Sequence, residues 1–184
     1  DLCSTGNLNW ISNSSTDHDT DGCLDTTFVL GTQQLVTNGT NLLTETLTDG
    51  AVAFAGHFNW NSMTAGNFSI NSNSSSKDVF VGKMNEDGEW SYLVSFGNDG
   101  DDESIVDLAP APEGGVYILM EYSDEITVNE TTFYANSYSC FGCISSGAQN
   151  TNILLIRINE DGTEEWTVQF GNYDTDNAWS MDVD

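Results

Sequence analysis

Residues 78–109 read DVFVGKMNEDGEWSYLVSFGNDGDDESIVDLA, and residues 152–183 read NILLIRINEDGTEEWTVQFGNYDTDNAWSMDV. The tetrapeptide Asn-Glu-Asp-Gly occurs at Asn85–Gly88 and again at Asn159–Gly162, 74 positions later. The tripeptide Phe-Gly-Asn follows in both copies with the same spacing. Two separate motifs that recur at one spacing predict a repeat architecture.

Each copy has the pattern of a β-hairpin: a short apolar run, an Asp-Gly turn, and a second run that carries a tryptophan. Asp-Gly between two such runs indicates a hairpin, because the turn needs a positive φ that glycine adopts without strain. The other runs are also rich in β-branched and aromatic residues, and none keeps a helical period. We therefore predict an all-β protein. The predicted strands are residues 26–30, 41–48, 51–58, 78–84, 89–96, 103–109, 116–122, 153–158, 164–170 and 177–183.

A second match divides these strands into units. Gly50–Val52 matches Gly114–Val116 at a spacing of 64 rather than 74, so ten residues are inserted between this match and the next one. Cys140 and Cys143 lie in that insertion. We predict two complete antiparallel four-stranded units, with one end strand before them and one after them.

The charge of the chain limits the classes of partner that it is expected to bind. Its 184 residues include 29 acidic residues but only three basic ones, Lys77, Lys83 and Arg157, so the net charge is −26. This charge repels nucleic acid and anionic membranes, so we expect neither as a partner. No apolar run approaches the ~18 residues that cross a membrane, so no membrane insertion is expected. Aromatic residues make up 11% of the chain, which is enough for a core and argues against a disordered acidic tail.

Residues 1–25 form a separate small unit before the repeat region of residues 26–184. Residues 17–25 read DHDTDGCLD, which places aspartates and a glycine at the spacing of an EF-hand-type calcium loop. Phe28 stands where an EF-hand has its bidentate glutamate. A merely solvated acidic loop is the alternative. The predicted calcium ligands are Asp17, Asp19, Asp21, the backbone carbonyl of Cys23, and Asp25.

The four cysteines form an even set in a chain of extracellular composition, and we predict the disulfides Cys3–Cys23 and Cys140–Cys143. A redox motif or half of a zinc site is the alternative for the second pair. Five Asn-x-Ser/Thr sequons agree with an exported, glycosylated surface. The candidate glycosylation sites are Asn13, Asn38, Asn67, Asn73 and Asn129. We therefore expect an extracellular or cell-surface location.

Two resemblances follow from these motifs. The D-x-D-x-D-G run with its cysteines resembles the calcium repeats of thrombospondin type 3, which implies a calcium-binding module. The units resemble the seven-bladed propeller (SBBP) repeats, whose blades read like D-x-F-V-x-K-L-x-x-x-G-x-x-x-W, and the likeness covers about residues 28–184. It implies a β-propeller-like repeat region but no particular function. The matching residues are Asp78, Phe80, Val81, Lys83, Gly88 and Tyr92 in the first copy, and Ile156, Arg157, Ile158, Gly162 and Trp166 in the second.

No residue is predicted to be catalytic, since the sequence lacks the motifs of serine hydrolases, zinc proteases and phosphate-binding loops. Lys83 and Arg157 occupy aligned positions, and we expect each to pair with a local acid rather than with a substrate. Asp87 and Asp161 are expected to shape the hairpin turns. The tryptophans are expected to pack against the sheets, although a sugar-stacking face is the alternative.

These features predict an extracellular structural or adhesive protein, stabilised by calcium, rather than an enzyme. Because two blades do not close a propeller, we expect either a part of a larger propeller or copies that join through their end strands into a homopolymer or filament. The alternative is a carbohydrate-binding or glycan-active domain with glycans as partners. Buried tryptophans and large contacts between chains would favour the structural or adhesive protein. Paired carboxylates beside an exposed tryptophan would favour the carbohydrate-binding or glycan-active domain.

Overall fold

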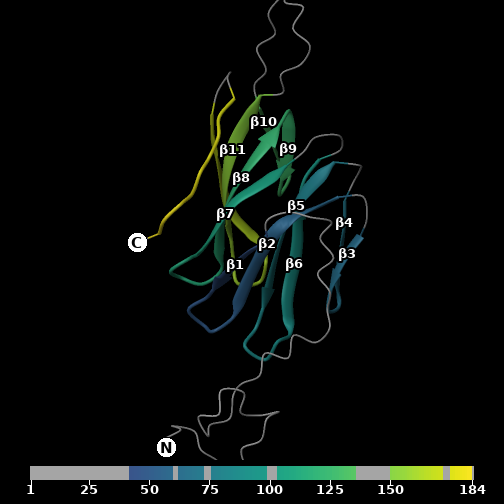
Figure 1. Ribbon diagram of the computed structural model, residues 1–184, viewed down its shortest axis with the longest axis vertical. Coiled ribbons are helices and arrows are strands. Elements are labelled where there is room, and N and C mark those ends of the chain that lie inside the picture. The colour runs from purple at the N-terminus through teal and green to yellow at the C-terminus, as the bar shows by residue number, and fades with distance from the viewer. Residues whose placement is uncertain are drawn as a thin grey trace, which may run out of the picture.

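The computed structural model describes residues 42–59, 62–72, 76–98, 103–135, 150–171 and 175–183. These residues form β-strands and turns (Figure 1). They contain no helix, and therefore no helix that could span a membrane. The prediction of an all-β protein is confirmed. The strands are β1 (Leu43–Thr46), β2 (Val52–Asn59), β3 (Ser62–Ala65), β4 (Phe68–Asn71), β5 (Lys77–Met84), β6 (Trp90–Phe96), β7 (Ser104–Pro110), β8 (Val116–Ser123), β9 (Glu125–Val128), β10 (Thr131–Tyr134), β11 (Thr151–Ile158) and β12 (Glu164–Phe170).

The strands form two antiparallel four-stranded sheets, as the repeat predicts. The first sheet has the order β1-β2-β5-β6, and the second has the equivalent order β7-β8-β11-β12. Each sheet also has a hairpin between its second and third strands, β3–β4 in the first and β9–β10 in the second. The insertion predicted in the second unit lies between β10 and β11, which are separated by 16 residues against five between β4 and β5.

Four glycines occupy equivalent positions in the turns that join paired strands of the two sheets. Gly50, Gly88, Gly114 and Gly162 have φ values of 80°, 79°, 89° and 86°. In each turn the glycine N–H donates to a backbone carbonyl three residues earlier at 3.0 Å. The left-handed conformation costs other residues about 1–2 kcal/mol, which explains why glycine stands at each of these positions.

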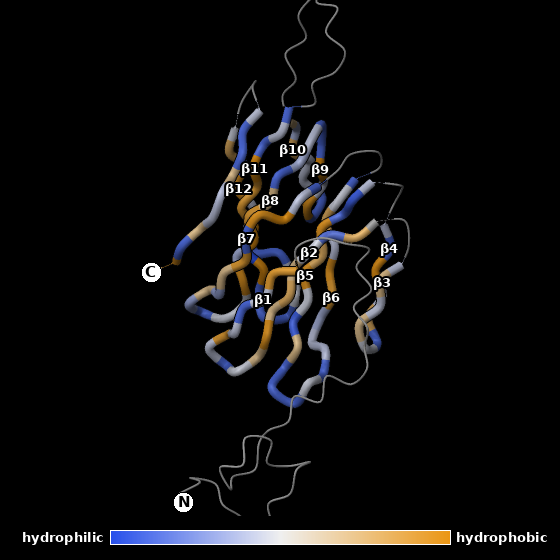
Figure 2. The backbone as a smooth tube through the Cα atoms, in the orientation of Figure 1, coloured by the Kyte–Doolittle hydropathy of each residue, from blue (hydrophilic) through white to orange (hydrophobic). Residues whose placement is uncertain are grey.

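The main core lies between the two sheets. The facing side of the first sheet is lined mostly by small and medium side chains, and that of the second by larger aliphatic ones. In Figure 2 the backbone of the inner strands has the colour of hydrophobic residues over much of its length. Full burial of one such large side chain stabilises the fold by about 1.5–3 kcal/mol. The central contacts are made by Ala53, Ala55, Val79, Val81 and Tyr92 on the first sheet and by Ile118, Met120, Leu154, Ile156 and Ile158 on the second.

A smaller core covers the other face of the first sheet. Hairpin β3–β4 packs there, and Trp90 lies over Gly82 and beside Phe54, with 5.3 Å between the ring centroids. A Cβ at Gly82 would come within 2.7 Å of the Trp90 ring, so the absent side chain makes room for the indole. The buried members are Phe58, Met63, Ala65, Phe80 and Leu93.

The C-terminal segment differs from the prediction. Residues 175–183 form no strand, so the expected end strand at residues 177–183 is wrong. The segment instead lies beside the second sheet, where carboxylates accept its backbone N–H groups. Ala178 donates to Glu121 Oε1 and Met181 donates to Asp107 Oδ2, both at 2.8 Å. The expected leading strand at residues 26–30 and the module of residues 1–25 lie outside the described residues.

Candidate functional site

Most of the site residues expected from the sequence fall outside the described residues. These are the calcium ligands Asp17, Asp19, Asp21, Cys23 and Asp25, the remaining cysteines Cys3, Cys140 and Cys143, and the sequons at Asn13, Asn38 and Asn73. The calcium site, both disulfides and these modifications therefore stay predictions. Within the described ranges no group of three or more His, Cys, Asp or Glu side chains is arranged to hold a metal ion.

Two sequons lie at equivalent places. Asn67 is exposed in the turn of hairpin β3–β4, and Asn129 is exposed in the turn of hairpin β9–β10, where its φ is 44°. Both turns are accessible from solvent, as glycosylation requires. Whether either asparagine carries a glycan stays a prediction.

The aligned cations have a structural role in both units. Lys83 is buried in β5, and its Nζ donates to Asp49 Oδ2 at 2.7 Å. This hydrogen bond lowers the pKa of Asp49 from its usual range. Asp49 lies in the β1–β2 turn and also accepts the N–H of Ala51 at 3.1 Å. The pair therefore fastens the first turn of the unit to its third strand, as the expected pairing with a local acid requires.

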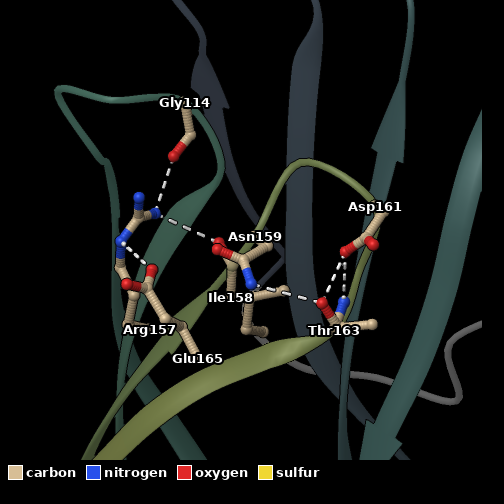
Figure 3. Close-up of polar contacts among 7 residues, drawn as sticks. All are labelled: Gly114, Arg157, Ile158, Asn159, Asp161, Thr163 and Glu165. Carbon is tan, nitrogen blue, oxygen red and sulfur yellow. Dashed lines mark hydrogen bonds and ion pairs between the residues drawn. The ribbon is translucent and has the colours of Figure 1, made fainter.

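Arg157 makes the equivalent connection in the second unit with different partners (Figure 3). Its Nη1 donates to the carbonyl of Gly114 at 2.6 Å and to that of Ile158 at 3.2 Å. Its Nε lies 3.4 Å from Glu165 Oε2. The guanidinium holds the β7–β8 turn against β11, again with a local acid, as expected.

An aromatic stack extends from this arginine across three neighbouring strands. Tyr117, Arg157 and Trp166 are register partners on β8, β11 and β12. The guanidinium carbon lies 5.2 Å from the centroid of the Tyr117 ring, which is within the range of a cation–π contact. The ring centroids of Tyr117 and Trp166 lie 5.7 Å apart, and the angle between the ring planes is 41°. A cavity of about 330 Å³ adjoins the stack and is lined by Tyr117, Leu155, Trp166, Met181, Asp182 and Val183.

The stack belongs to a larger apolar face, formed by the side of the second sheet that points away from the first. On its edge strand β12, Trp166, Val168 and Phe170 are 37%, 42% and 48% exposed. A monomeric soluble protein seldom exposes several large apolar side chains in one row, and such rows mark interaction surfaces. We call this row of three the β12 face. The sequence motifs do not predict this face, although the alignment of Trp166 with Tyr92 is a signal for it.

The chain was also compared with known proteins. A scan of protein-family models finds no match, and a search of curated proteins finds no similar protein. The resemblances to propeller repeats and to thrombospondin type 3 repeats therefore stay predictions.

Proposed function

We propose that this chain is an extracellular structural or adhesive repeat protein that assembles with copies of itself at a cell surface or in a filament. The observation that supports the proposal is the stacking of two equivalent four-stranded units, which leaves the β12 face of the second unit partly exposed. A unit that buries one face against its neighbour and exposes a second apolar face is typical of a stacked array.

The roles of the aligned cations agree with a structural protein. Lys83 and Arg157 are the basic side chains that occupy equivalent positions in the two units, where a bound anion or substrate could contact them. Their donors instead bind Asp49, Glu165 and turn carbonyls. The geometry thus commits them to holding the turns of the two units.

Location and calcium enter the proposal from the sequence. The sequons, the predicted disulfides and the acidic surface support an extracellular setting. The aspartates of residues 17–25 support a calcium-stabilised N-terminal module. The sequence also predicts that end strands join the copies; because residues 177–183 form no strand, that joint would require this segment to pair as a strand only on assembly.

Sedimentation of the chain over a wide concentration range, in calcium and in chelator, tests the proposal. We expect species heavier than the 20.0 kDa monomer, in proportions that rise with concentration. A chain that stays monomeric at every concentration, with and without calcium, would contradict the assembly role.

The aromatic stack favours a second candidate function, carbohydrate binding. Tyr117 and Trp166 border an open cavity, and Asp182 supplies a carboxylate at its rim. Sugars stack on such rings and donate hydrogen bonds to such oxygens. Titration with a panel of oligosaccharides, followed by tryptophan fluorescence, tests this reading. Binding that Trp166→Ala abolishes and Trp179→Ala preserves would support it, because Trp179 does not line the cavity.

A further inference from the structure

The contact between the two units pairs a side chain of one with a turn of the other. Tyr92 on β6 of the first unit is 3% exposed and lies against Gly162 in the β11–β12 turn of the second. Val94 and Phe96 follow Tyr92 on β6 and pack against the same core. The joint between units is therefore a row of apolar side chains on the last strand of one unit, set against the last turn and hairpin of the next.

The second unit carries the same row on an exposed face, where residues 181–183 border Trp166 but no further unit packs among the described residues. Tyr92 is the register partner of Lys83, and Trp166 is the register partner of Arg157. Trp166 thus occupies the place of Tyr92 in its own unit, but it is 37% exposed. Val168 and Phe170 correspond in the same way to the packed Val94 and Phe96.

The first unit carries the complementary half of the joint. Gly88 is the equivalent of Gly162, and the two have φ values of 79° and 86°. Tyr92 covers Gly162, whereas a cavity of about 390 Å³ lies beside Gly88. The walls of this cavity come from the β3–β4 and β5–β6 turns and the first residues of β4 and β6, and they consist of Gly66, Asn67, Phe68, Gly88, Glu89 and Trp90.

The two halves lie on opposite sides of the molecule. In Figure 2 strand β12 and the C-terminal segment lie on one side of the view, and hairpin β3–β4 lies on the other. One copy therefore cannot close this joint on itself, whereas two copies can. We propose that Trp166 of one copy inserts into the cavity beside Gly88 of a second copy, by the same relation that places Tyr92 against Gly162.

This joint rests on the proposed assembly and specifies its interface. Val168 and Phe170 then meet hairpin β3–β4 of the second copy, where Phe68 and Ile70 are only partly buried. The two surfaces differ, so the contact is head-to-tail and gives a ring if it closes or a filament if it does not. Its aromatic and aliphatic side chains are apolar, whereas Asn67 and Glu89 add polar atoms to the cavity wall, and each copy carries a charge of −26. Salt screens that repulsion, so association tightens as salt rises from ~0.1 M to ~1 M.

Single substitutions on the β12 face test the joint in the full chain. Trp166→Ser and Val168→Lys change exposed side chains, and we expect each to weaken association at least tenfold, measured by sedimentation. Tyr134→Lys is the matched control, because Tyr134 is 56% exposed on hairpin β9–β10 and lies outside the β12 face. Thermal melting of each variant confirms that it folds. Association that is unchanged in Trp166→Ser and Val168→Lys overturns the joint but leaves the proposed assembly standing, whereas a monomeric wild-type chain overturns both.

A mixing experiment tests the head-to-tail arrangement. Glu89→Trp adds an indole at an exposed position of the cavity wall and fills the cavity from within. Chains with Val168→Lys keep an open cavity, and chains with Glu89→Trp keep an intact β12 face. Each variant alone is expected to be monomeric, and an equal mixture is expected to give dimers containing one of each. A mixture that stays monomeric, or a Glu89→Trp chain that associates like the wild type, overturns the proposal.

Discussion

The ring of Tyr92 lies so close to Gly162 that a Cβ on the glycine would come within 2.7 Å of the ring Cγ. Gly162 also has a φ of 86°, where other residues are strained. Two independent requirements thus select glycine at this position. One comes from the turn itself, and the other comes from the neighbouring unit that packs on it.

Replacement of this glycine tests how strongly the two units depend on their contact. Gly162→Ala should lower the free energy of unfolding by about 2–4 kcal/mol, because left-handed strain and overpacking against Tyr92 act together. Urea unfolding measures the change.

Gly50→Ala is the matched control. Gly50 has a φ of 80° in the equivalent turn, but its nearest contact would be Glu86 at 3.8 Å, an ordinary separation. We expect this variant to lose only the strain, about 1–2 kcal/mol. Equal losses in the two variants would show that Tyr92 does not press on the turn.

The guanidinium of Arg157 supports the turn of the second unit. Arg157→Met keeps most of the side-chain volume but removes the hydrogen bonds to the carbonyls of Gly114 and Ile158. Bonds from charged donors contribute about 1.5–3 kcal/mol, so a loss of that size in the free energy of unfolding is expected. Glu165→Gln is the control and should cost less than about 1 kcal/mol, since this partner is half exposed. A larger loss in the control would mean that the ion pair, and not the turn, is the main contribution.

Two buried tyrosines make the fold sensitive to alkali. Burial raises the pKa of Tyr122 to about 12 from its ordinary value of 10.0, with partial compensation by Asn152 and Gln169, and burial also raises the pKa of Tyr92. The folded-state pKa lies above the unfolded one, so the stabilisation is complete below pH ~10 and is lost as pH rises through about 12.

We expect the free energy of unfolding to fall above pH ~10, and Tyr122→Phe to reduce that fall. Tyrosinate absorbance gives the titration directly. Tyr134→Phe, at a site 56% exposed, should leave the pH dependence unchanged. A Tyr122→Phe chain as sensitive to alkali as the wild type would contradict the assignment.

The repeat was predictable because its turns have a recognisable local sequence. Glycine after aspartate or glutamate at Gly50, Gly88, Gly114 and Gly162 identifies local geometry that needs no knowledge of the rest of the chain. Hairpins β3–β4 and β9–β10 were not predicted because their strands have four residues each and most of their exposed positions are polar. Such strands are stable only through the sheet on which they pack.

The C-terminal segment shows the opposite error. Residues 177–183 alternate like a strand, but a strand also needs a neighbouring backbone, and the sequence does not specify one. In the structure the carboxylates of Asp107 and Glu121 satisfy two of its N–H groups instead. The aromatic stack was hidden for a related reason. Tyr117 and Trp166 become neighbours of Arg157 only through the pairing of three strands.

The calcium module gives a prediction that is independent of the sheets. Removal of calcium should loosen residues 1–25, because Asp17, Asp19, Asp21 and Asp25 would repel one another without a cation. The two sheets, from β1 to β12, should remain folded, since their described cores are built from side chains between Leu47 and Ile158. Hydrogen exchange with and without chelator measures both regions. Exchange in residues 1–25 that ignores the chelator would refute the metal assignment.

The C-terminal segment separates two ways of joining copies. Deletion of residues 178–184 removes the bonds to Glu121 and Asp107 but leaves Trp166, Val168 and Phe170 in place on β12. If Trp166 makes the joint, the truncated chain should associate at least as tightly as the full chain, because the deletion uncovers more of the same apolar face. Strand addition through the end of the chain predicts the reverse. Sedimentation of the two chains side by side decides, and a truncated chain that is folded but monomeric would assign the joint to the C-terminal segment.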